Sequence, residues 1–511
     1  MARRSKKRGF PTLNRRNFMQ LSGGCATLSS TSLLSTLVNL KLTNTAIANG
    51  GDLNGYKSMV CIFLLGGVDS FNVLAPFEDN EYTDYSNARS NLALPKDQLL
   101  EVGTTSGRKF GVHPGMPEIR DLYNDNKLAF VANVGSLVEP TTLANYDNVK
   151  KPLGLYSHSD LIRHWQTSVP ESRTQVTGWA GRMADMLNDT VNQHPAIGMN
   201  ISLSGLNTFE TGTSIVPYVV QSGGASALSG YGGTGTGLGG MYTRFTDNAL
   251  SETYGDLLEK SYAGVRRQSI QAAIDFNSST DAVELNTAFP DSGLGSRLKM
   301  IAQAIGARQS LQQSRQIFFV SIGGWDHHDN VIDNQAGMLP MVSQAMKAFY
   351  DATVELGVSN EVVTFTASDF GRTLSSNGNG SDHAWGGNQL VMGGGVAGGD
   401  VYGSYPTSLA LGNNLDTGRG RLIPTTSVDE YNAELACWFG VQNNSDLQDV
   451  LPNIRNFYSE TSSQPPVGFM GNASGGNRTG GAPGQGGGIG NPGDGELPGD
   501  GDSGLGGGNP F

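Results

Sequence analysis

The fold of this chain is decided by the stretch VTFTASDFGRTLSSNGNGSDHAWGG, residues 363–387. A run of β-branched and aromatic residues stops just before Asp369, and a loop of Gly, Ser and Asn then leads to Asp382 and His383. An acid at the end of a strand, followed by an Asp-His pair on a loop, is how a parallel sheet presents metal ligands at its carboxyl edge. The stretch therefore predicts a strand over 361–367 with a metal site beside it.

Two earlier segments repeat this arrangement. Residues 317–322 form an apolar run that leads into GGWDHH (323–328), and residues 59–65 form another that leads into GGVDS (66–70). Unbroken apolar runs of this length suit strands inside a sheet that is covered on both faces. Because the carboxyl ends of parallel strands meet at one edge of the sheet, we expect the acids and histidines after the three strands to lie together.

The residues that follow the last two strands form a candidate ligand set. Asp326, His328 and His383 would provide one carboxylate and two imidazoles, which suit Zn²⁺ or Mn²⁺ better than Ca²⁺ or Mg²⁺. His327 is an alternative to His328. Alternation along an extended segment puts Asp326 and His328 on the same side, so His328 is the preferred ligand.

A second metal site is also predicted, and it is richer in oxygen. Asp69 and Asp369 would hold it, so the sequence predicts one or two divalent ions. Two metals at about 4 Å can clamp a phosphoryl or sulfuryl group between the attacking and leaving oxygens. The alternative role for Asp69 is a simple turn at the end of its strand.

The candidate nucleophile is Ser157, at the start of a predicted helix where free backbone amides stabilise an anion. Ser157 also suits an N-cap, with Asp160 as the reciprocal acid at the third helical position. Ser70 is the alternative nucleophile. Arg163 or Arg372 would bind a non-bridging oxygen of the substrate through two hydrogen bonds.

The other histidines have simpler expected roles. His158 and His164 are expected to pack or to form hydrogen bonds rather than to bind metal. His113 and His194 each precede a proline and are expected in turns.

Strands alternate with helical patterns along residues 57–460, which predicts one doubly wound α/β domain with a mostly parallel sheet and helices on both faces. Residues 222–240 are rich in Gly and Ser and predict a loop insertion, either ordered at the surface or disordered.

The other predicted strands are 128–134, 196–201, 215–220 and 388–393. The predicted helices are 114–126, the helix that begins at Ser157, 177–187, 242–276, 293–311, 338–356 and 427–439, the last capped by Ser427 and Glu430.

The first 48 residues predict a twin-arginine signal peptide. Arg15 and Arg16 precede a weakly apolar stretch over 28–40, and small residues at 46–48 supply a cleavage site. We therefore expect the twin-arginine translocase as a partner and a periplasmic or secreted location. Residues 471–511 consist almost entirely of Gly, Pro, Asp and Asn and predict a disordered tail.

The charge excludes some partners. The formal net charge is −12, and it is more negative once the eight basic residues of the signal are removed, because that segment holds no acid. Such a protein repels phosphate backbones, so nucleic acid is excluded as a partner. After the signal no stretch has the apolar length of a transmembrane helix, so the mature chain is expected to have none.

Several stretches together resemble a known family. They are LLGGVDSFNVLAP (64–76), HPGMPEIRDLYNDNKLAFVANVG (113–135), YSHSDLIRHWQTS (156–168), GGWDHHDN (323–330), SDFGRT (368–373) with DHAWGG (382–387), and IPTTSVDEYNAELACWFGV (423–441). The chain resembles, over residues 57–442, a bacterial family of twin-arginine-exported proteins of unknown function. That family is distantly related to the alkaline phosphatase superfamily, which includes sulfatases. The resemblance implies an alkaline phosphatase-like core with a metal centre at the carboxyl edge of its sheet.

The chain also departs from that superfamily. Phe370 stands where phosphatases usually place a histidine after the acid, and His328 follows Asp326 more closely than usual. The motif that sulfatases convert to formylglycine is missing, and Cys61 lies inside a strand. The resemblance implies a metal-dependent hydrolase of a phosphate or sulfate ester, with a small-molecule or polymer ester as substrate. The alternative is a non-catalytic periplasmic or cell-surface protein that keeps a structural metal.

Overall fold

A large, mostly parallel sheet forms the centre of the molecule, with helices packed on it. The computed structural model describes residues 53–441, 444–459, 462 and 464–471. The strands of the sheet follow the order β11-β5-β10-β9-β1-β8-β6-β7, and β12 also pairs with β5. The predicted signal peptide, 1–48, lies outside the described residues, and so does the predicted tail after Gly471.

The strand β1, Lys57–Leu64, lies at the middle of this sheet. It pairs in parallel with β8, Arg315–Ile322, on one side and with β9, Val362–Ser368, on the other. Alternate residues of β1 enter two different hydrophobic clusters, one on each face. Burial on both faces explains why β1 is an unbroken apolar run.

The strand β10, Gly387–Met392, runs antiparallel to its neighbours β9 and β5, Leu128–Gly135. It therefore begins at the edge where the parallel strands end. The loop from β9 to β10, which carries His383, is held at the carboxyl edge for this reason. The remaining strands of the sheet are β6 (Asn200–Ser202), β7 (Tyr218–Val219), β11 (Val401–Tyr402) and β12 (Thr426–Ser427).

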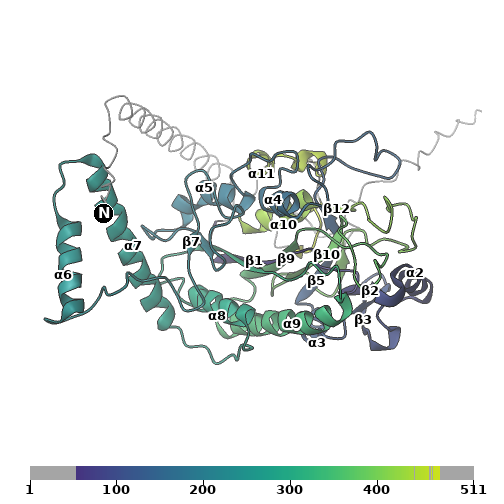
Figure 1. Ribbon diagram of the computed structural model, residues 1–511, viewed down its shortest axis with the longest axis horizontal. Coiled ribbons are helices and arrows are strands. Elements are labelled where there is room, and N and C mark those ends of the chain that lie inside the picture. The colour runs from purple at the N-terminus through teal and green to yellow at the C-terminus, as the bar shows by residue number, and fades with distance from the viewer. Residues whose placement is uncertain (1–52, 442–443, 460–461, 463, 472–511) are drawn as a thin grey trace, which may run out of the picture.

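Helices cover both faces of the sheet (Figure 1). One face carries α3 (Pro117–Asn124), α8 (Gly293–Gly306) and α9 (Val331–Glu355). The other carries α4 (His158–Thr167), α5 (Trp179–Val191), α10 (Val428–Phe439) and α11 (Asn444–Val450). This arrangement is a mixed α/β fold with a mostly parallel sheet, as the alternation of strands and helices predicts.

A smaller sheet and one helix were not predicted. The sheet has the strands β2 (Leu74–Pro76), β4 (Lys109–Val112) and β3 (Leu100–Gly103), in that order, and the helix is α2 (Asp79–Arg89). These strands are short, and α2 is polar, so neither has the periodicity on which the sequence analysis relies. The last residue of α2, Arg89, is important for the site described below.

The predicted helix over 242–276 is wrong, because the structure has two helices there. They are α6, Leu238–Ser251, and α7, Leu257–Asp281. The first helix ends at Ser251. The side chain of Asp256 then accepts hydrogen bonds from the amides of Leu258 and Glu259 and caps the start of α7. The Gly/Ser-rich stretch before α6 forms turns and bends, and α6 begins inside the predicted loop.

The predicted cap of the late helix is confirmed. Ser427 accepts a hydrogen bond from the amide of Glu430, and the Glu430 carboxylate accepts one from the amide of Ser427. Among the helices of the described residues, none combines the length and the apolarity that crossing a membrane requires.

Candidate metal centre

Three side chains converge at the carboxyl edge of the sheet. His158 is the first residue of α4, Asp326 follows β8, and His383 precedes β10, and one ligand atom from each lies within 4.8 Å of the others. Nε2 of His158 lies 3.3 Å from Asp326 Oδ2, and Nε2 of His383 lies 3.2 Å from Asp326 Oδ1. We call these three residues the triad.

The other nitrogen of each imidazole is already bound. Nδ1 of His158 donates to Asp369 Oδ2 over 2.7 Å, and Nδ1 of His383 donates to the carbonyl oxygen of Tyr156 over 2.9 Å. A carbonyl can only accept, so the proton of His383 sits on Nδ1 and Nε2 carries the lone pair. Nε2 of His158 faces the Asp326 carboxylate. Metal-binding histidines are held by such outer partners.

Nε2 of each imidazole in the triad faces the Asp326 carboxylate, an arrangement that a shared cation would stabilise. Ligands that lie about 2.0–2.1 Å from a tetrahedral Zn²⁺ are roughly 3.3 Å from one another. The observed separations of 3.2 and 3.3 Å match that value. The residues present thus fit a metal ion bound by nitrogen and oxygen.

His328, the preferred ligand in the sequence analysis, lies beside the triad. Its Nε2 is 3.1 Å from Asp326 Oδ1 and 2.9 Å from Nε2 of His383, while its Nδ1 is 3.1 Å from Asp382 Oδ1. The neighbouring His327 is buried, with its ring near that of Trp325, and burial lowers the pKa of His327. The structure therefore also brings the predicted set of Asp326, His328 and His383 together, with separations as short as those within the triad.

Asp369 orients His158 through a hydrogen bond. It is buried, and its two oxygens accept hydrogen bonds from His158 and from the amide of Gly66, the latter over 3.1 Å. Burial raises the pKa of Asp369, and the hydrogen bond from His158 opposes that shift. The structure places Asp369 as the partner of a histidine and does not bring it into the triad.

Asp69 does not join the triad either. Its Oδ2 accepts from Arg89 over 2.6 Å and from Ser381 Oγ over 2.8 Å, and both Asp69 and Arg89 are buried. Its Oδ1 has no hydrogen-bond partner among the described residues. Its Oδ2 is engaged by Arg89 and Ser381, and the structure does not bring Asp69 into the triad.

The two candidate arginines both donate to backbone carbonyls. Arg372 is buried and donates to the carbonyls of Gly67, Ser381 and Gly66 over 2.8–2.9 Å, and it also contacts the Asp326 carboxylate. Arg372 thus links the segments that follow β1, β8 and β9. Arg163 donates to the carbonyl of Gln175 over 2.8 Å.

Arg372 also sets the charge of the triad. Partial burial works to raise the pKa of Asp326, but the hydrogen bond and charge of Arg372 outweigh it, so that pKa lies below its usual value. Burial lowers the pKa of His383, against the opposing effect of its bond to Tyr156. Asp326 is thus an anion and His383 a neutral base near pH 7.

Ser157 occupies the N-cap position of α4, but it does not form the predicted reciprocal cap. Its side chain accepts no hydrogen bond from the first turn, and Ser157 Oγ lies 3.2 Å from Ser159 Oγ. Asp160 instead accepts from Arg173 over 2.7 Å. The hydroxyl of Ser157 therefore does not cap a backbone amide of α4. The alternative nucleophile, Ser70, is buried, and its Oγ accepts from the amide of Asn388.

Phe370 packs against both imidazoles of the triad. Its ring centroid lies 4.8 Å from that of His158 and 4.6 Å from that of His383. The approach requires glycine at position 67, where φ is +79° and a Cβ atom would lie 2.4 Å from the Phe370 ring. Phe370 thus holds the two rings in place without offering a ligand.

The sequence analysis missed His158 as a ligand candidate. Its signal was present, because His158 follows the proposed nucleophile at the start of a helix. The convergence itself depends on Tyr156, whose φ of +75° turns the chain so that its carbonyl meets His383. Such a left-handed conformation at a non-glycine residue has no signature in the sequence.

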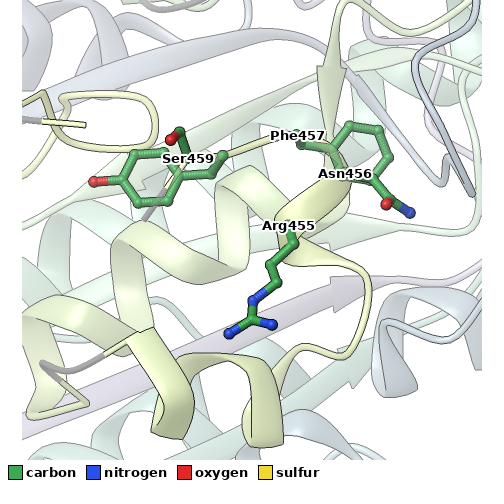
Figure 2. Close-up of a pocket in the computed structure, with 5 residues that line it drawn as sticks. Arg455, Asn456, Phe457 and Ser459 are labelled. Atoms are coloured by element: carbon green, nitrogen blue, oxygen red, sulfur yellow. The ribbon is translucent and has the colours of Figure 1, made fainter. Parts of the chain in front are cut away.

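A pocket elsewhere has different chemistry. Figure 2 shows that it is lined by five consecutive residues, 455–459, at and after a short 3₁₀ turn. It contains no acid and no histidine, so it is separate from the triad.

The fold and the site define a class, an α/β protein with a candidate metal centre at the carboxyl edge of its sheet. Residues 236–415 match the model of a family described as "Protein of unknown function (DUF1501)". No curated protein matches the chain. Among solved structures, the "Crystal structure of PsFucS1 sulfatase from Pseudoalteromonas sp." is similar at a TM-score of 0.27 and 10% sequence identity, covering 72% of this chain and 68% of that one.

Proposed function

We propose that this protein is an exported hydrolase of a phosphate or sulfate ester that uses one divalent metal. The observation that carries the proposal is the convergence of two imidazoles on one carboxylate, at His158, His383 and Asp326. Export through the twin-arginine route, to the periplasm or outside the cell, is part of the proposal and rests on residues 1–48.

One metal is favoured over two. Asp69 is paired with Arg89, and Asp369 is bonded to His158, so the two acids expected to hold a second ion are both engaged. The ligand set of two imidazoles and one carboxylate favours Zn²⁺ or Mn²⁺ over Ca²⁺ or Mg²⁺. Such a metal polarises a phosphoryl or sulfuryl oxygen and lowers the pKa of bound water.

Ser157 is the proposed nucleophile. Its hydroxyl accepts no capping hydrogen bond from α4, and Ser157 directly precedes His158, a residue of the triad. Unpaired amides of the first turn of α4 would stabilise an anionic group held there. The triad lies at a partly exposed rim, which gives an ester substrate access.

A second function is favoured by Arg372. It is buried and donates to three backbone carbonyls, so its guanidinium group is not presented to a substrate anion. A protein that keeps the metal for stability and performs no catalysis would have this arrangement.

The test measures metal content and ester turnover on the same preparations, purified without chelator. We expect one equivalent of metal, lost in His383→Ala, and turnover of a phosphate or sulfate ester that EDTA abolishes. Ser157→Ala should remove turnover and keep the metal. The matched control is Ser159→Ala, which changes the neighbouring exposed hydroxyl and should keep both.

The outcomes separate the two functions. One equivalent of metal without turnover of any ester, together with a melting temperature that EDTA lowers, favours the structural metal. A preparation with no metal excludes both. Full activity in Ser157→Ala removes that residue from the mechanism.

A further inference from the structure

The helices α6 and α7 form a hairpin that stands away from the sheet and its covering helices (Figure 1). No role in the metal centre involves it. Its large apolar side chains are turned to the outside, although a solvated hairpin would place polar residues there. Exposed apolar surface of this kind is typical of an interface with another molecule.

The exposed apolar residues follow helical spacing on both helices. On α6, Leu238, Met241, Tyr242 and Phe245 recur at intervals of three and four, and Phe245 is 72% exposed. The only buried residue of this helix is Gly240. The stripe on α6 is thus directed away from the rest of the protein.

A matching stripe lies on α7. Leu258, Tyr262 and Val265 recur at intervals of four and three, and each is more than 60% exposed. On the same helix Ala263 and Ile270 are buried, so the stripe lies on a different side from the packed face. We call the stripes of α6 and α7 together the hairpin patch.

Charges flank the stripe of α7 in a self-complementary pattern. Glu259 precedes Tyr262 by three residues, and Arg266 follows it by four. Neither side chain has a hydrogen bond or ion pair among the described residues, whereas Arg267 contacts the carbonyl of Leu250 within the hairpin. When two copies of α7 lie antiparallel across a two-fold axis near Tyr262, Glu259 of each copy faces Arg266 of the other.

We propose that the hairpin patch is the interface of a homodimer, formed by α7 packing antiparallel on the α7 of a second copy. Charge complementarity selects this occupant over a membrane surface. The hairpin, 238–281, carries four basic and six acidic residues, while helices that bind membrane surfaces are rich in Lys and Arg.

The apolar area is adequate for such an interface. Aromatic side chains bury roughly 150–250 Å² each, so Phe245 and Tyr262, at 72% and 70% exposed, would each remove about 100 Å² or more from water. A standard interface buries about 800 Å² per partner. The remaining residues of the patch, Leu238, Met241, Tyr242, Leu258 and Val265, supply further area.

The test is sedimentation velocity over a concentration series, with charge-reversal variants of the full chain. We expect the wild type to dimerise. Glu259→Arg and Arg266→Glu should each weaken the dimer about tenfold or more, since like charges then face each other twice. The double variant E259R/R266E restores opposite charges and should restore the dimer. Lys299→Glu, an exposed charge reversal on α8, is the control and should change nothing.

Circular dichroism of each variant shows that the chain is folded, since all these positions are exposed. A wild-type monomer at the highest concentration overturns the proposal. So do single variants that dimerise like the wild type, or a double variant that stays monomeric. Equal binding of wild type and variants to vesicles of anionic lipid, with no dimer in solution, would assign the patch to a membrane instead.

Discussion

Two aspartates occupy equivalent places in the chain and have opposite environments. Asp69 follows β1 in the sequence GGVD, and Asp326 follows the adjacent strand β8 in the sequence GGWD. Asp326 is 44% exposed beside two imidazoles, whereas Asp69 is 1% exposed against Arg89. Both acids pair with a buried arginine, but only Asp326 is partly exposed and faces imidazoles that could share a metal with it.

The difference depends on which side chains from other segments of the chain contact each aspartate. Arg89, the last residue of α2, neutralises Asp69, and Ser381 adds a hydrogen bond. At Asp326 a buried arginine, Arg372, is present as well, but His158 and His383 also face the carboxylate. A strand end followed by two glycines thus provides only a position for an acid. The role of that acid depends on the side chains that contact it.

The largest effect should come from the buried pair. Arg89→Ala leaves the Asp69 carboxylate buried without a counter-ion, which costs about 3–5 kcal/mol of the free energy of unfolding. Urea denaturation measures this loss. Metal content of the folded variant should equal that of the wild type, since the triad is not touched.

Lys96→Ala is the control for Arg89→Ala, because it removes an ion pair to the exposed Asp79 and should not change stability measurably. Loss of metal from folded Arg89→Ala would show that Asp69 belongs to the metal centre after all, and the comparison between the two aspartates would then be wrong.

The sequence predicted the frame of this site well. The strands β1, β8, β9 and β5 and the meeting of their ends follow from apolar runs that stop at glycine or acid, since a sheet covered on both faces leaves no other place for them. The predicted set also contained two of the three triad residues, Asp326 and His383.

The rest depended on contacts between distant segments. Arg89 lies on a polar helix without a periodic signal, so its pairing with Asp69 was not predictable. His158 entered the triad through the conformation of Tyr156, and a left-handed residue other than glycine leaves no mark in the sequence. Arg372 was predicted to bind substrate, yet three backbone carbonyls at segment ends accept its protons.

A smaller effect should separate His158 from His328 as ligands. Asp369→Asn replaces the carboxylate that orients His158 by a neutral group of similar size, and changes of this kind reduce metal affinity about 10–100-fold. Asp382→Asn makes the same change beside His328 and should reduce affinity less, because His328 is outside the triad. Competition with a chromogenic chelator measures both affinities. A greater loss in Asp382→Asn would make His328 the ligand and His158 its neighbour.

The smallest effect concerns pH, and it contrasts an exposed histidine of the triad with a buried one. Burial is the main cause that lowers the pKa of both His383 and His327 below 6.5. Each is therefore protonated in the folded chain only at lower pH than in the unfolded chain. Stability from both is full above pH 6.5 and declines as the pH falls through the folded pKa.

Only the protonation of His383 should weaken metal binding, because its Nε2 is in the triad. We expect metal retention, followed by equilibrium dialysis, to persist below pH 6.5 and to fall as His383 takes up a proton. His327→Gln should make the decline of stability with falling pH less steep and leave the metal-retention curve in place. If His327→Gln shifted the pH at which metal is lost, the buried His327 would be coupled to the metal centre. The separation between the environments of Asp69 and Asp326 would then be one of exposure and not of function.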